Sequence, residues 1–423
     1  MDKDEIRVNR SDLVQLTMDL VRLPTVNAPP NGQELIGQIY IEKLMREIGL
    51  DVHRVYPEII RAEDNSGAFL TDRSFEDRYC VVGIWHGTGG GRSLLLSGHM
   101  DVTPPEPLAW KQCDPFEPVT DGTVIYGRGT ADMKGGLAAM LTAVKVLKDS
   151  GFAPSGDVLL ESVVDEEFAG ANGTIADRLA GYNADFAINA EPTGLVVCPA
   201  CVGAHIIKIT VQGKAGMPYT GEAIYNPVNG ITRVIDILSE YERELADHEV
   251  CHPLWQNSPQ RDRAVIITKL SAGETGEHGQ LGTPIDAWTE VVIQTYPGEE
   301  SEESFNRFKT FFDKKIKNSQ ELQKRSITLD REYRYVEPSN CGIDHDGVRV
   351  LIGCVEKALG ELPKVYGAPF SCDLAAFYKY GRTPACVFGP IGGNLHAPDE
   401  WVDIESLEKA THAFVLMIKN WCH

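Results

Sequence analysis

Apolar positions near the start of the chain recur at the spacing of a helix. One series lies within residues 11–20 and a second within residues 35–44. Apolar residues three or four positions apart share one helix face, so each series predicts an amphipathic helix. Pro24 and the pair Pro29 and Pro30 separate the two series, and proline disfavours a helix interior because it lacks a backbone N–H. We therefore expect two helices ahead of the first strands.

Short apolar runs follow these helices and alternate with a further helix. Residues 79–85 and 93–97 are joined by a glycine-rich segment, which predicts a β-hairpin leading into a buried strand. A helix is expected at residues 135–148, and strands at 158–164 and 186–189. Strands that alternate with helices at this spacing are typical of an α/β layer with a largely parallel sheet.

Residues 201–334 carry a self-contained order of elements. The pattern predicts strand, helix, strand, strand, helix and strand, at residues 204–211, 227–245, 264–270, 287–296, 301–318 and 325–333. This βαββαβ order is the ferredoxin-like arrangement. Beyond it the α/β pattern resumes, with a helix, a strand and a helix at residues 346–360, 385–388 and 404–420.

Length and element order together predict two domains. The 423 residues exceed the ~100–200 that are usual for one domain. We expect an α/β catalytic domain of three layers with a mostly parallel sheet, formed by residues 1–200 and 335–423. The ferredoxin-like α+β domain at residues 201–334 is then an insertion into the catalytic domain.

Composition and charge argue against several classes of function. Hydrophobic residues make up 43% and charged residues 24%, as in ordinary globular proteins. The 61 acidic and 40 basic residues give a net charge of −21. Such a surplus repels nucleic acids and anionic membranes, so neither is expected as a partner.

The chain lacks the sequence signals of secretion, membrane insertion and disulfide bonding. The charged first ten residues do not resemble a signal peptide, and no apolar run reaches the ~18 residues of a membrane span. A cytoplasmic location is therefore expected. The ten cysteines are scattered, which predicts free thiols. Cys198 and Cys201 have the spacing of a metal or redox pair, but without a second pair they are expected to be ordinary strand-edge residues.

Possible metal ligands stand directly after several of the apolar runs. The candidate side chains are, in chain order, His99, Asp101, Asp132, Glu166, Glu167, Glu191 and His396. An α/β sheet displays its functional site at the ends of its strands, so these side chains are expected to meet. Histidine and carboxylate without thiolate suit Zn²⁺, or Mn²⁺ and Co²⁺ where oxygen donors dominate. The number of ligands fits two divalent ions.

Some of these residues also admit a plainer interpretation. Asp132 stands just before the helix at 135–148, where a carboxylate often only stabilises the helix start. The acidic run that contains Glu166 and Glu167 resembles a solvated face, although apolar residues lead into it. Asp101, two residues after His99, is placed to accept the second ring N–H of that histidine and so fix its tautomer.

The ordered set of motifs resembles the M20 metallopeptidase family, which includes aminoacylase and acetylornithine deacetylase. The matching motifs are His99-x-Asp101, Asp132-Met133-Lys134-Gly135, Glu166-Glu167, Glu191-Pro192 and His396-x-Pro398-x-Glu400. The resemblance covers essentially the whole chain. It implies a zinc-peptidase-like catalytic domain and an inserted lid domain that also forms a homodimer or larger oligomer.

The resemblance also implies roles for the individual residues. Asp132 would bridge two divalent ions, with His99 and Glu191 completing one site and Glu167 and His396 completing the other. A bound divalent ion lowers the pKa of its water, so hydroxide is available near neutral pH. By the same resemblance, Glu166 is the general base and Asp101 orients His99.

The chain departs from the family in residues that contact the substrate. The family carries a lid histidine that stabilises the oxyanion, but Met217 stands at that position and cannot donate a hydrogen bond. Loss of one oxyanion donor typically lowers kcat by ~10²–10³, so Tyr219 or His205 is a candidate substitute, unless His205 is only a strand residue. Asp373 matches a further motif, but the arginine that grips a substrate carboxylate in the family is missing there.

These departures favour a change of substrate over a change of reaction class. The sequence predicts a metal-dependent hydrolase that cleaves a C–N bond of a small molecule. Removal of an amino group from an electron-poor aromatic ring needs no carbonyl oxyanion, so the branch that releases ammonia from 5-nitroanthranilate is one candidate. The alternatives are a peptidase or N-acyl amino acid deacylase, and a non-catalytic binding protein on the same fold. The last is disfavoured because Glu166 and every ligand are retained.

Overall fold

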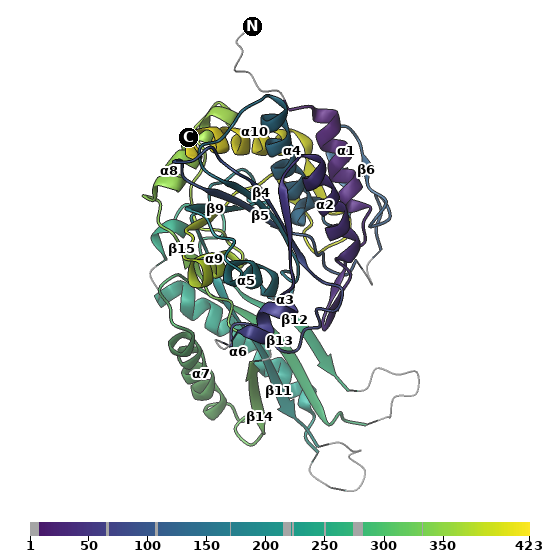
Figure 1. The fold of residues 1–423 in the computed structure, drawn as a ribbon. Coiled ribbons are helices and arrows are strands. Elements are labelled where there is room, and N and C mark those ends of the chain that lie inside the picture. The colour runs from purple at the N-terminus through teal and green to yellow at the C-terminus, as the bar shows by residue number, and fades with distance from the viewer. Residues whose placement is uncertain are drawn as a thin grey trace. The chain divides into compact units, whose positions relative to one another are not determined.

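The computed structural model describes residues 8–64, 67–105, 109–169, 171–214, 221, 224–248, 251–273, 282–331 and 333–423 (Figure 1). The chain divides into two compact units. The larger unit comprises Met1–Ala200, Asn340–Ala368 and Cys372–His423, and the smaller unit comprises Cys201–Ser339 and Pro369–Ser371.

A six-stranded sheet forms the centre of the larger unit. Its strands, in spatial order, are β16 (Ala385–Val387), β9 (Phe186–Asn189), β5 (Leu94–His99), β8 (Val158–Val163), β4 (Cys80–Trp85) and β3 (Asp51–Val55). The first four run parallel, β4 is antiparallel to β8, and β3 is antiparallel to β4. The predicted α/β fold with a mostly parallel sheet is thereby confirmed.

The predicted hairpin between residues 79–85 and 93–97 is wrong. β8 lies between β4 and β5, antiparallel to the former and parallel to the latter. The glycine-rich connection instead bonds to the segment before β8, since Thr88 donates to the Pro154 carbonyl and Gly89 to the Ser155 carbonyl. The segment between β4 and β5 is long enough for the two strands to lie apart, with another strand between them. Both apolar strands therefore pair with β8, which is buried along its whole length.

Helices cover both faces of this sheet. The helices of the larger unit are α1 (Arg10–Val21), α2 (Leu35–Glu47), α3 (Pro57–Glu63), α4 (Gly135–Asp149), α5 (Asn172–Leu179), α8 (Asp346–Leu359), α9 (Leu374–Gly381) and α10 (Ile404–Trp421). Neighbouring residues of β4 point to opposite faces: Val81 packs in the cluster that contains Leu141 and Phe414, and Val82 in the cluster that contains Ile175. The two predicted N-terminal helices are confirmed as α1 and α2.

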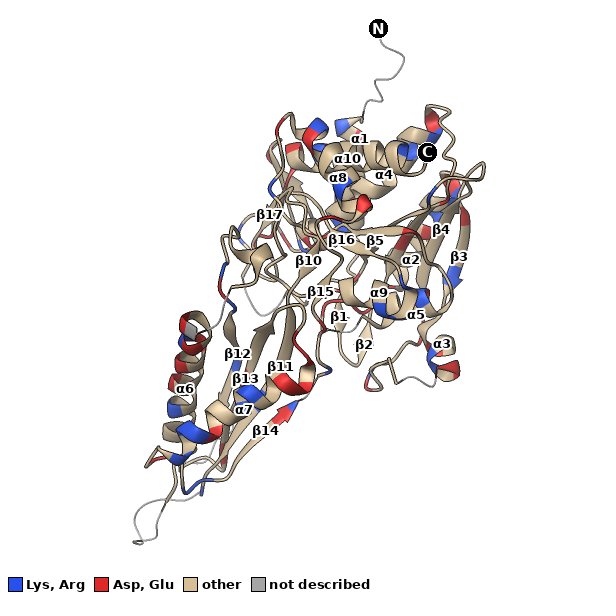
Figure 2. Cartoon of the chain, turned by 90° about the vertical axis from the view of Figure 1, so that its left-hand side faces the viewer, with Lys and Arg blue, Asp and Glu red and all other residues tan. Residues whose placement is uncertain are grey.

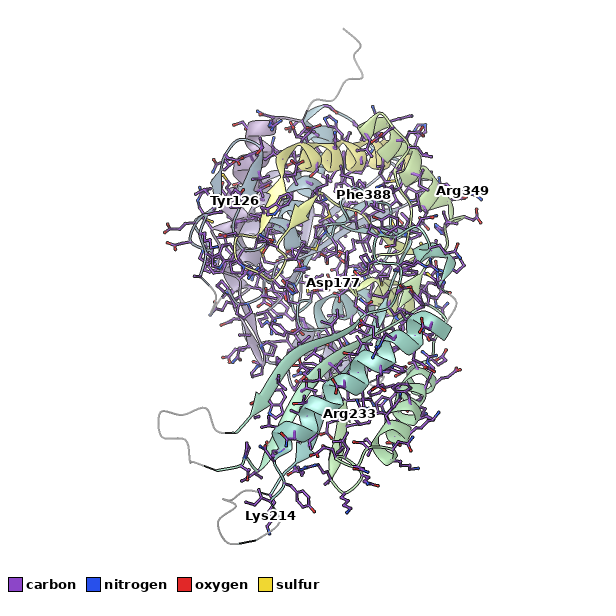
Figure 3. All side chains as sticks on the ribbon, turned by 180° about the vertical axis from the view of Figure 1, so that it is seen from behind. Tyr126, Asp177, Lys214, Arg233, Arg349 and Phe388 are labelled. Atoms are coloured by element: carbon purple, nitrogen blue, oxygen red, sulfur yellow. The ribbon has the colours of Figure 1, made fainter. Side chains whose placement is uncertain are left out.

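The remaining short strands form a second sheet and two strand pairs. A second sheet has the order β17 (Gly392–Gly393), β18 (Trp401–Asp403), β7 (Val124–Tyr126) and β6 (Val119–Thr120). Two-stranded pairs are formed by β1 (Asn27–Ala28) with β2 (Asn31–Gly32), and by β10 (Ala200–Cys201) with β15 (Ser339–Asn340). Phe388, just after β16, lies fully buried among the side chains of this unit (Figure 3).

The smaller unit has a four-stranded antiparallel sheet with two helices. Its elements are β11 (Gly203–Gln212), α6 (Pro227–His248), a 3₁₀ turn (Pro253–Trp255), β12 (Val265–Ala272), β13 (Asp286–Thr295), α7 (Ser301–Lys317) and β14 (Ile327–Arg331). The spatial order is β12-β13-β11-β14, which together with the βαββαβ chain order is the ferredoxin-like arrangement. Both helices carry charges of both signs on the surface (Figure 2).

Two further sequence expectations concern membranes and cysteines. Among the helices of the described residues, none has the length and apolar character needed to cross a membrane. All ten cysteines are free thiols, and both Cys198 and Cys201 are buried.

Candidate metal centre

The candidate ligands gather at the carboxyl ends of three neighbouring parallel strands. His99 is the last residue of β5, Glu166 and Glu167 follow β8, and Glu191 follows β9. Parallel strands end at the same edge of a sheet, so the three segments bring their polar side chains together there. Asp132 lies in the π-helical turn η1 (Thr130–Lys134) that leads into α4.

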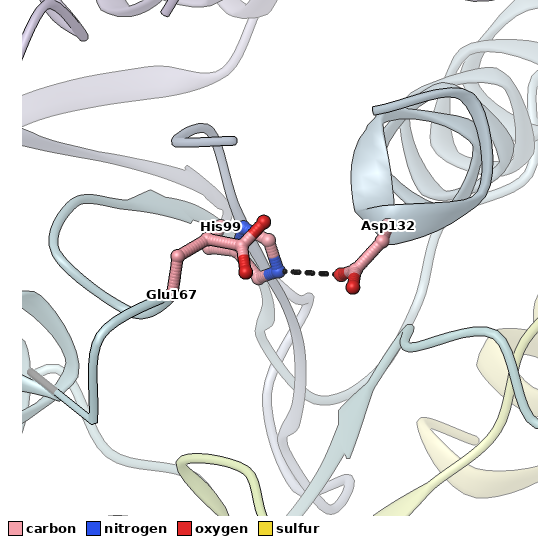
Figure 4. A group of neighbouring side chains, drawn as sticks. All are labelled: His99, Asp132 and Glu167. Carbon is pink, nitrogen blue, oxygen red and sulfur yellow. Dashed lines mark hydrogen bonds and ion pairs between the residues drawn. The ribbon is translucent and has the colours of Figure 1, made fainter. Parts of the chain in front are cut away.

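Asp132 faces two imidazoles, one with each carboxylate oxygen. Its Oδ1 lies 3.1 Å from Nε2 of His99, and its Oδ2 lies 3.1 Å from Nε2 of His396. Figure 4 shows the first of these pairs with Glu167 beside it. A carboxylate placed in this way could be shared by two cations, one beside each imidazole.

The remaining carboxylates divide between the two histidines. Oε1 of Glu191 lies 3.5 Å from Nε2 of His99, and Oε2 of Glu167 lies 2.8 Å from Nε2 of His396. Oε2 of Glu166 lies 3.9 Å from Nε2 of His99. Donor atoms of His99, Glu166 and Glu191 all fall within 4.8 Å of one another. The geometry therefore allows Glu166 to be either a ligand or a proton carrier.

Burial changes the acid–base properties of these groups. It raises the pKa of Glu167 and of Glu191 to about 7, and that of Glu166 well above its usual value. Burial alone would lower the pKa of His396, but contacts with Asp132 and Glu167 raise it to about 11. Two imidazoles and several mutually repelling carboxylates form a donor set that fits divalent cations.

Asp101 contacts His99 through a different atom from the one predicted. The ring Nδ1 of His99 lies 2.9 Å from the backbone carbonyl oxygen of Asp101 and 3.8 Å from its carboxylate Oδ1. The carboxylate Oδ2 instead accepts the backbone N–H of Glu166 at 3.0 Å, that of Glu167 at 3.1 Å, and the side-chain amide of Asn27 at 2.8 Å. A charged acceptor bonds strongly to backbone N–H groups, so Asp101 holds the turn that carries two other site residues.

A buried ion-pair network lies behind the same turn. Asp165 has a φ of 66° and lies 3.3 Å from Nε of Arg73 and 3.6 Å from Nη2 of Arg78. Arg78 also pairs with Glu34, and all four side chains are at most 1% exposed. Sequence reasoning missed these partners because they come from segments far from the motif.

Glu400 is a second residue whose role the sequence did not reveal. Its carboxylate is fully buried and accepts the backbone N–H of Asp132 at 3.1 Å. It also pairs with the buried side chain of Arg128 at 2.7 Å. The only sequence signal is its place four residues after His396.

Of the four residues predicted to contact the substrate, the structure describes Asp373 and His205. Asp373 is buried in the larger unit and accepts a hydrogen bond from Thr174 Oγ1 at 2.5 Å. Its charge contributes to the raised pKa of Glu166 and of Glu191 after burial itself, so it lies close to the centre. Met217 and Tyr219 lie outside the described residues.

His205 is engaged within the smaller unit. Its Nε2 lies 2.8 Å from Ser304 Oγ, and its ring centroid lies 4.5 Å from that of Tyr335. Burial lowers the pKa of His205 to about 4. These contacts explain the side chain without a substrate, so a role in substrate binding stays a prediction.

Comparisons with known proteins show the family of this chain. The model of peptidase family M20/M25/M40 matches residues 95–420. An N-formyl-4-amino-5-aminomethyl-2-methylpyrimidine deformylase from Bacillus subtilis is 26% identical over 99% of this chain and 96% of the relative. A curated deformylase of the same name from Halalkalibacterium halodurans is also 26% identical.

Solved structures share the fold over nearly the whole length. An M20 family metallo-carboxypeptidase from Sulfolobus solfataricus is 18% identical with a TM-score of 0.72, covering 97% of this chain and 99% of that one. Human carnosine dipeptidase 1 is 13% identical with a TM-score of 0.74, covering 98% and 97%. The family model spans most of the chain, and this protein therefore belongs to the M20/M25/M40 peptidase family, whose members are hydrolases that act on C–N bonds.

Proposed function

We propose that this protein hydrolyses the amide C–N bond of a small N-formyl or N-acyl substrate at a centre of two divalent cations. The observation that carries the proposal is the position of Asp132, with each oxygen 3.1 Å from a different imidazole. The deformylase relatives extend over essentially the whole chain, which supports an amide as the bond that is cleaved.

The residues divide the work of binding and proton transfer. Asp132 would be shared by the two cations, His99 with Glu191 would hold one, and His396 with Glu167 would hold the other. Bound Zn²⁺, Mn²⁺ or Co²⁺ supplies polarisation of water and of the substrate carbonyl.

Glu166 is proposed as the group that moves the proton. It takes a proton from the attacking water and delivers it to the leaving nitrogen, the two tasks of a general base that later acts as an acid. Burial raises its pKa well above the usual value, which makes the carboxylate a better acceptor for the proton of the attacking water; that proton would pass to the leaving nitrogen as the C–N bond breaks. The side chain is within 3.9 Å of His99, close enough to serve atoms held at the same centre.

Hydrolytic release of ammonia from an aromatic amine is a second candidate. Met217 favours it, because this residue replaces the oxyanion donor that amide hydrolysis needs. The substrate named for the deformylase relatives is itself a formylated aminopyrimidine, so it contains both an amide and an amino group on an electron-poor ring. A ring of this kind fits either reaction.

One assay separates the two reactions. Protein loaded with Zn²⁺ or with Mn²⁺ is incubated with the formylated aminopyrimidine, an N-acyl amino acid and 5-nitroanthranilate, and formate, carboxylate and ammonia are measured in parallel. Formate or carboxylate without ammonia supports the amidase, and ammonia alone supports the aminohydrolase. No product from any substrate class with either metal contradicts both.

The variant Glu166→Gln tests the proton carrier in the same assay. We expect kcat to fall by ~10²–10⁴, with two cations per chain retained. Loss of one cation would show instead that Glu166 is a ligand.

We also propose that the protein forms a homodimer through the edge of the smaller unit's sheet. Within the described residues, β12 pairs along one side only, with β13. This strand exposes Ile266 by 45% and Leu270 by 56%. An unpaired apolar edge strand readily pairs with a second chain.

A further inference from the structure

One buried carboxylate binds the whole turn that carries Asp132. Oε1 of Glu400 accepts the N–H groups of Ala131 at 3.0 Å and Asp132 at 3.1 Å. Oε2 accepts the N–H of Gly129 at 2.9 Å and a guanidinium N–H of Arg128 at 2.7 Å. The N–H groups at a helix start have no partner within the helix, so a remote carboxylate here replaces the usual local cap.

The same glutamate belongs to the loop that carries His396. Asn394, His396 and Asp399 all have φ between 56° and 59°, and Asn394 Nδ2 donates to the Asp399 carbonyl at 3.1 Å. The carbonyl of Glu400 in turn accepts the N–H of Gly127 at 2.9 Å. Backbone and side chain of one residue thus tie this loop to the turn at residues 127–132.

We propose that Glu400 is a positioning residue that fixes Asp132 relative to His396 and thereby sets the affinity of the cation site that these two residues share with Glu167. This inference rests on the proposed dinuclear centre. Asp132 and His396 are 264 residues apart in the chain, so their spacing depends on a contact between their segments. Glu400 makes that contact with four hydrogen bonds, each strengthened by the charge of the acceptor.

The contacts of Asp101 show the same construction on the other side of the centre. Asp101 follows His99 by two residues and holds the N–H groups of Glu166 and Glu167. Each ligand histidine is therefore followed closely by a buried carboxylate that binds the backbone of another ligand segment. Carboxylates in one site repel one another, so backbone held in this way keeps them together before a cation arrives.

The test is the variant Glu400→Gln, which keeps the size of the side chain. The glutamine amide has one acceptor oxygen instead of two. Its NH₂ group can only donate, so it cannot bond the N–H groups that the second carboxylate oxygen accepts. Cation affinity is measured without substrate, by competition of Zn²⁺ against a coloured chelator and by elemental analysis after dialysis. We expect the dissociation constant of one of the two cations to rise by ~10–100-fold, as for other residues that orient ligands, while the other cation stays bound.

A matched control separates positioning from general stability. Glu161→Gln replaces a buried glutamate of β8 that pairs with the buried Arg178 of the same unit, and Arg178 is not one of the candidate ligands. We expect it to lower the melting temperature of the metal-free protein without changing either dissociation constant. A further readout is rescue: saturating Zn²⁺ should restore kcat in Glu400→Gln but not in Asp132→Asn.

The possible results are distinguishable. Equal cation affinities in Glu400→Gln and the unsubstituted protein would overturn the assignment and leave Glu400 as a structural residue. If the unsubstituted protein binds two cations but turns over no substrate, while Glu400→Gln binds one of them more weakly, the proposed function is overturned and the assignment of Glu400 stands. A protein that binds no divalent cation would overturn both.

Discussion

The carboxyl edge of the six-stranded sheet and the core of the smaller unit contrast in the side chains that they bury. At the edge, His99, Asp101 and Glu191 are at most 4% exposed. The smaller unit buries an aliphatic and aromatic cluster that includes Val234, Phe308 and Phe312. Buried charges require partners, whereas apolar side chains require only close packing. The difference predicts that substitutions at the edge change function and substitutions in the cluster change stability.

Removal of the metal should have the largest effect. Dialysis against a strong chelator is expected to abolish turnover, because the carboxylates and imidazoles alone do not polarise the substrate. Restoration by added Zn²⁺ or Mn²⁺ is the measurement, and the cation that gives the higher kcat identifies the better cofactor. If protein that elemental analysis shows to be metal-free keeps full turnover, the reaction does not depend on metal bound at the sheet edge.

Phe312→Ala tests the apolar cluster of the smaller unit. The ring is fully buried in the apolar cluster of the smaller unit, so its loss should lower the free energy of unfolding by ~3–5 kcal/mol. Chemical denaturation measures this change. The number of cations per chain should stay at two below the unfolding transition, and loss of a cation there would show that the two regions are not independent.

His205→Gln tests whether a histidine of the smaller unit belongs to the functional site. Burial lowers the pKa of His205 to about 4, from a usual value near 6.5. The folded protein therefore binds the proton less readily, and stability is lost as the pH falls from about 6.5 to about 4. The loss amounts to up to about 3 kcal/mol, and denaturation at several pH values should show it reduced in the variant.

The same variant has a second readout. Turnover at neutral pH should change only a few-fold, because Ser304 and Tyr335 account for the contacts of the ring. A fall in kcat by ~10²–10³ would instead identify His205 as the substitute oxyanion donor.

Leu270→Lys should have the smallest effect on the chain itself. Leu270 is 56% exposed on the edge strand β12, so folding stability is expected to change by less than about 0.5 kcal/mol. Light scattering coupled to size exclusion should show a dimer for the unsubstituted protein and a monomer for the variant. A monomer in both cases would refute the proposed interface. Leu362→Lys, which places the same charge at a 71% exposed leucine of the larger unit, is the matched control and should leave the dimer intact.

The sequence predicts the candidate ligands that lie together at the edge, but not the contacts that support them. His99 and Glu191 were predictable because each follows an apolar run, and Asp132 because it stands before a helix in the same ordered set of motifs. The partners of Glu400 were not, because they lie about 270 positions away and leave no periodic signal.

The elements of the fold could also be predicted from local sequence, whereas the pairing of distant strands could not. The βαββαβ order of the smaller unit was predictable because each element has its own hydrophobic period. The position of β8 between β4 and β5 depended on which distant strand pairs best, so the predicted hairpin was wrong. Likewise, the sequence did not show that Oδ2 of Asp101 binds the backbone N–H groups of residues 166–167, or that the His99 ring lies closer to the backbone carbonyl of Asp101 than to its carboxylate.

The number of divalent cations bound per chain tests the central claim most directly. Elemental analysis after equilibrium dialysis is performed on the unsubstituted protein, on Asp132→Asn and on Glu166→Gln. Two cations are expected in the unsubstituted protein and in Glu166→Gln, and at most one in Asp132→Asn, whose two oxygens are placed between His99 and His396. Two tightly bound cations in Asp132→Asn, or none in the unsubstituted protein, would contradict a centre bridged by Asp132.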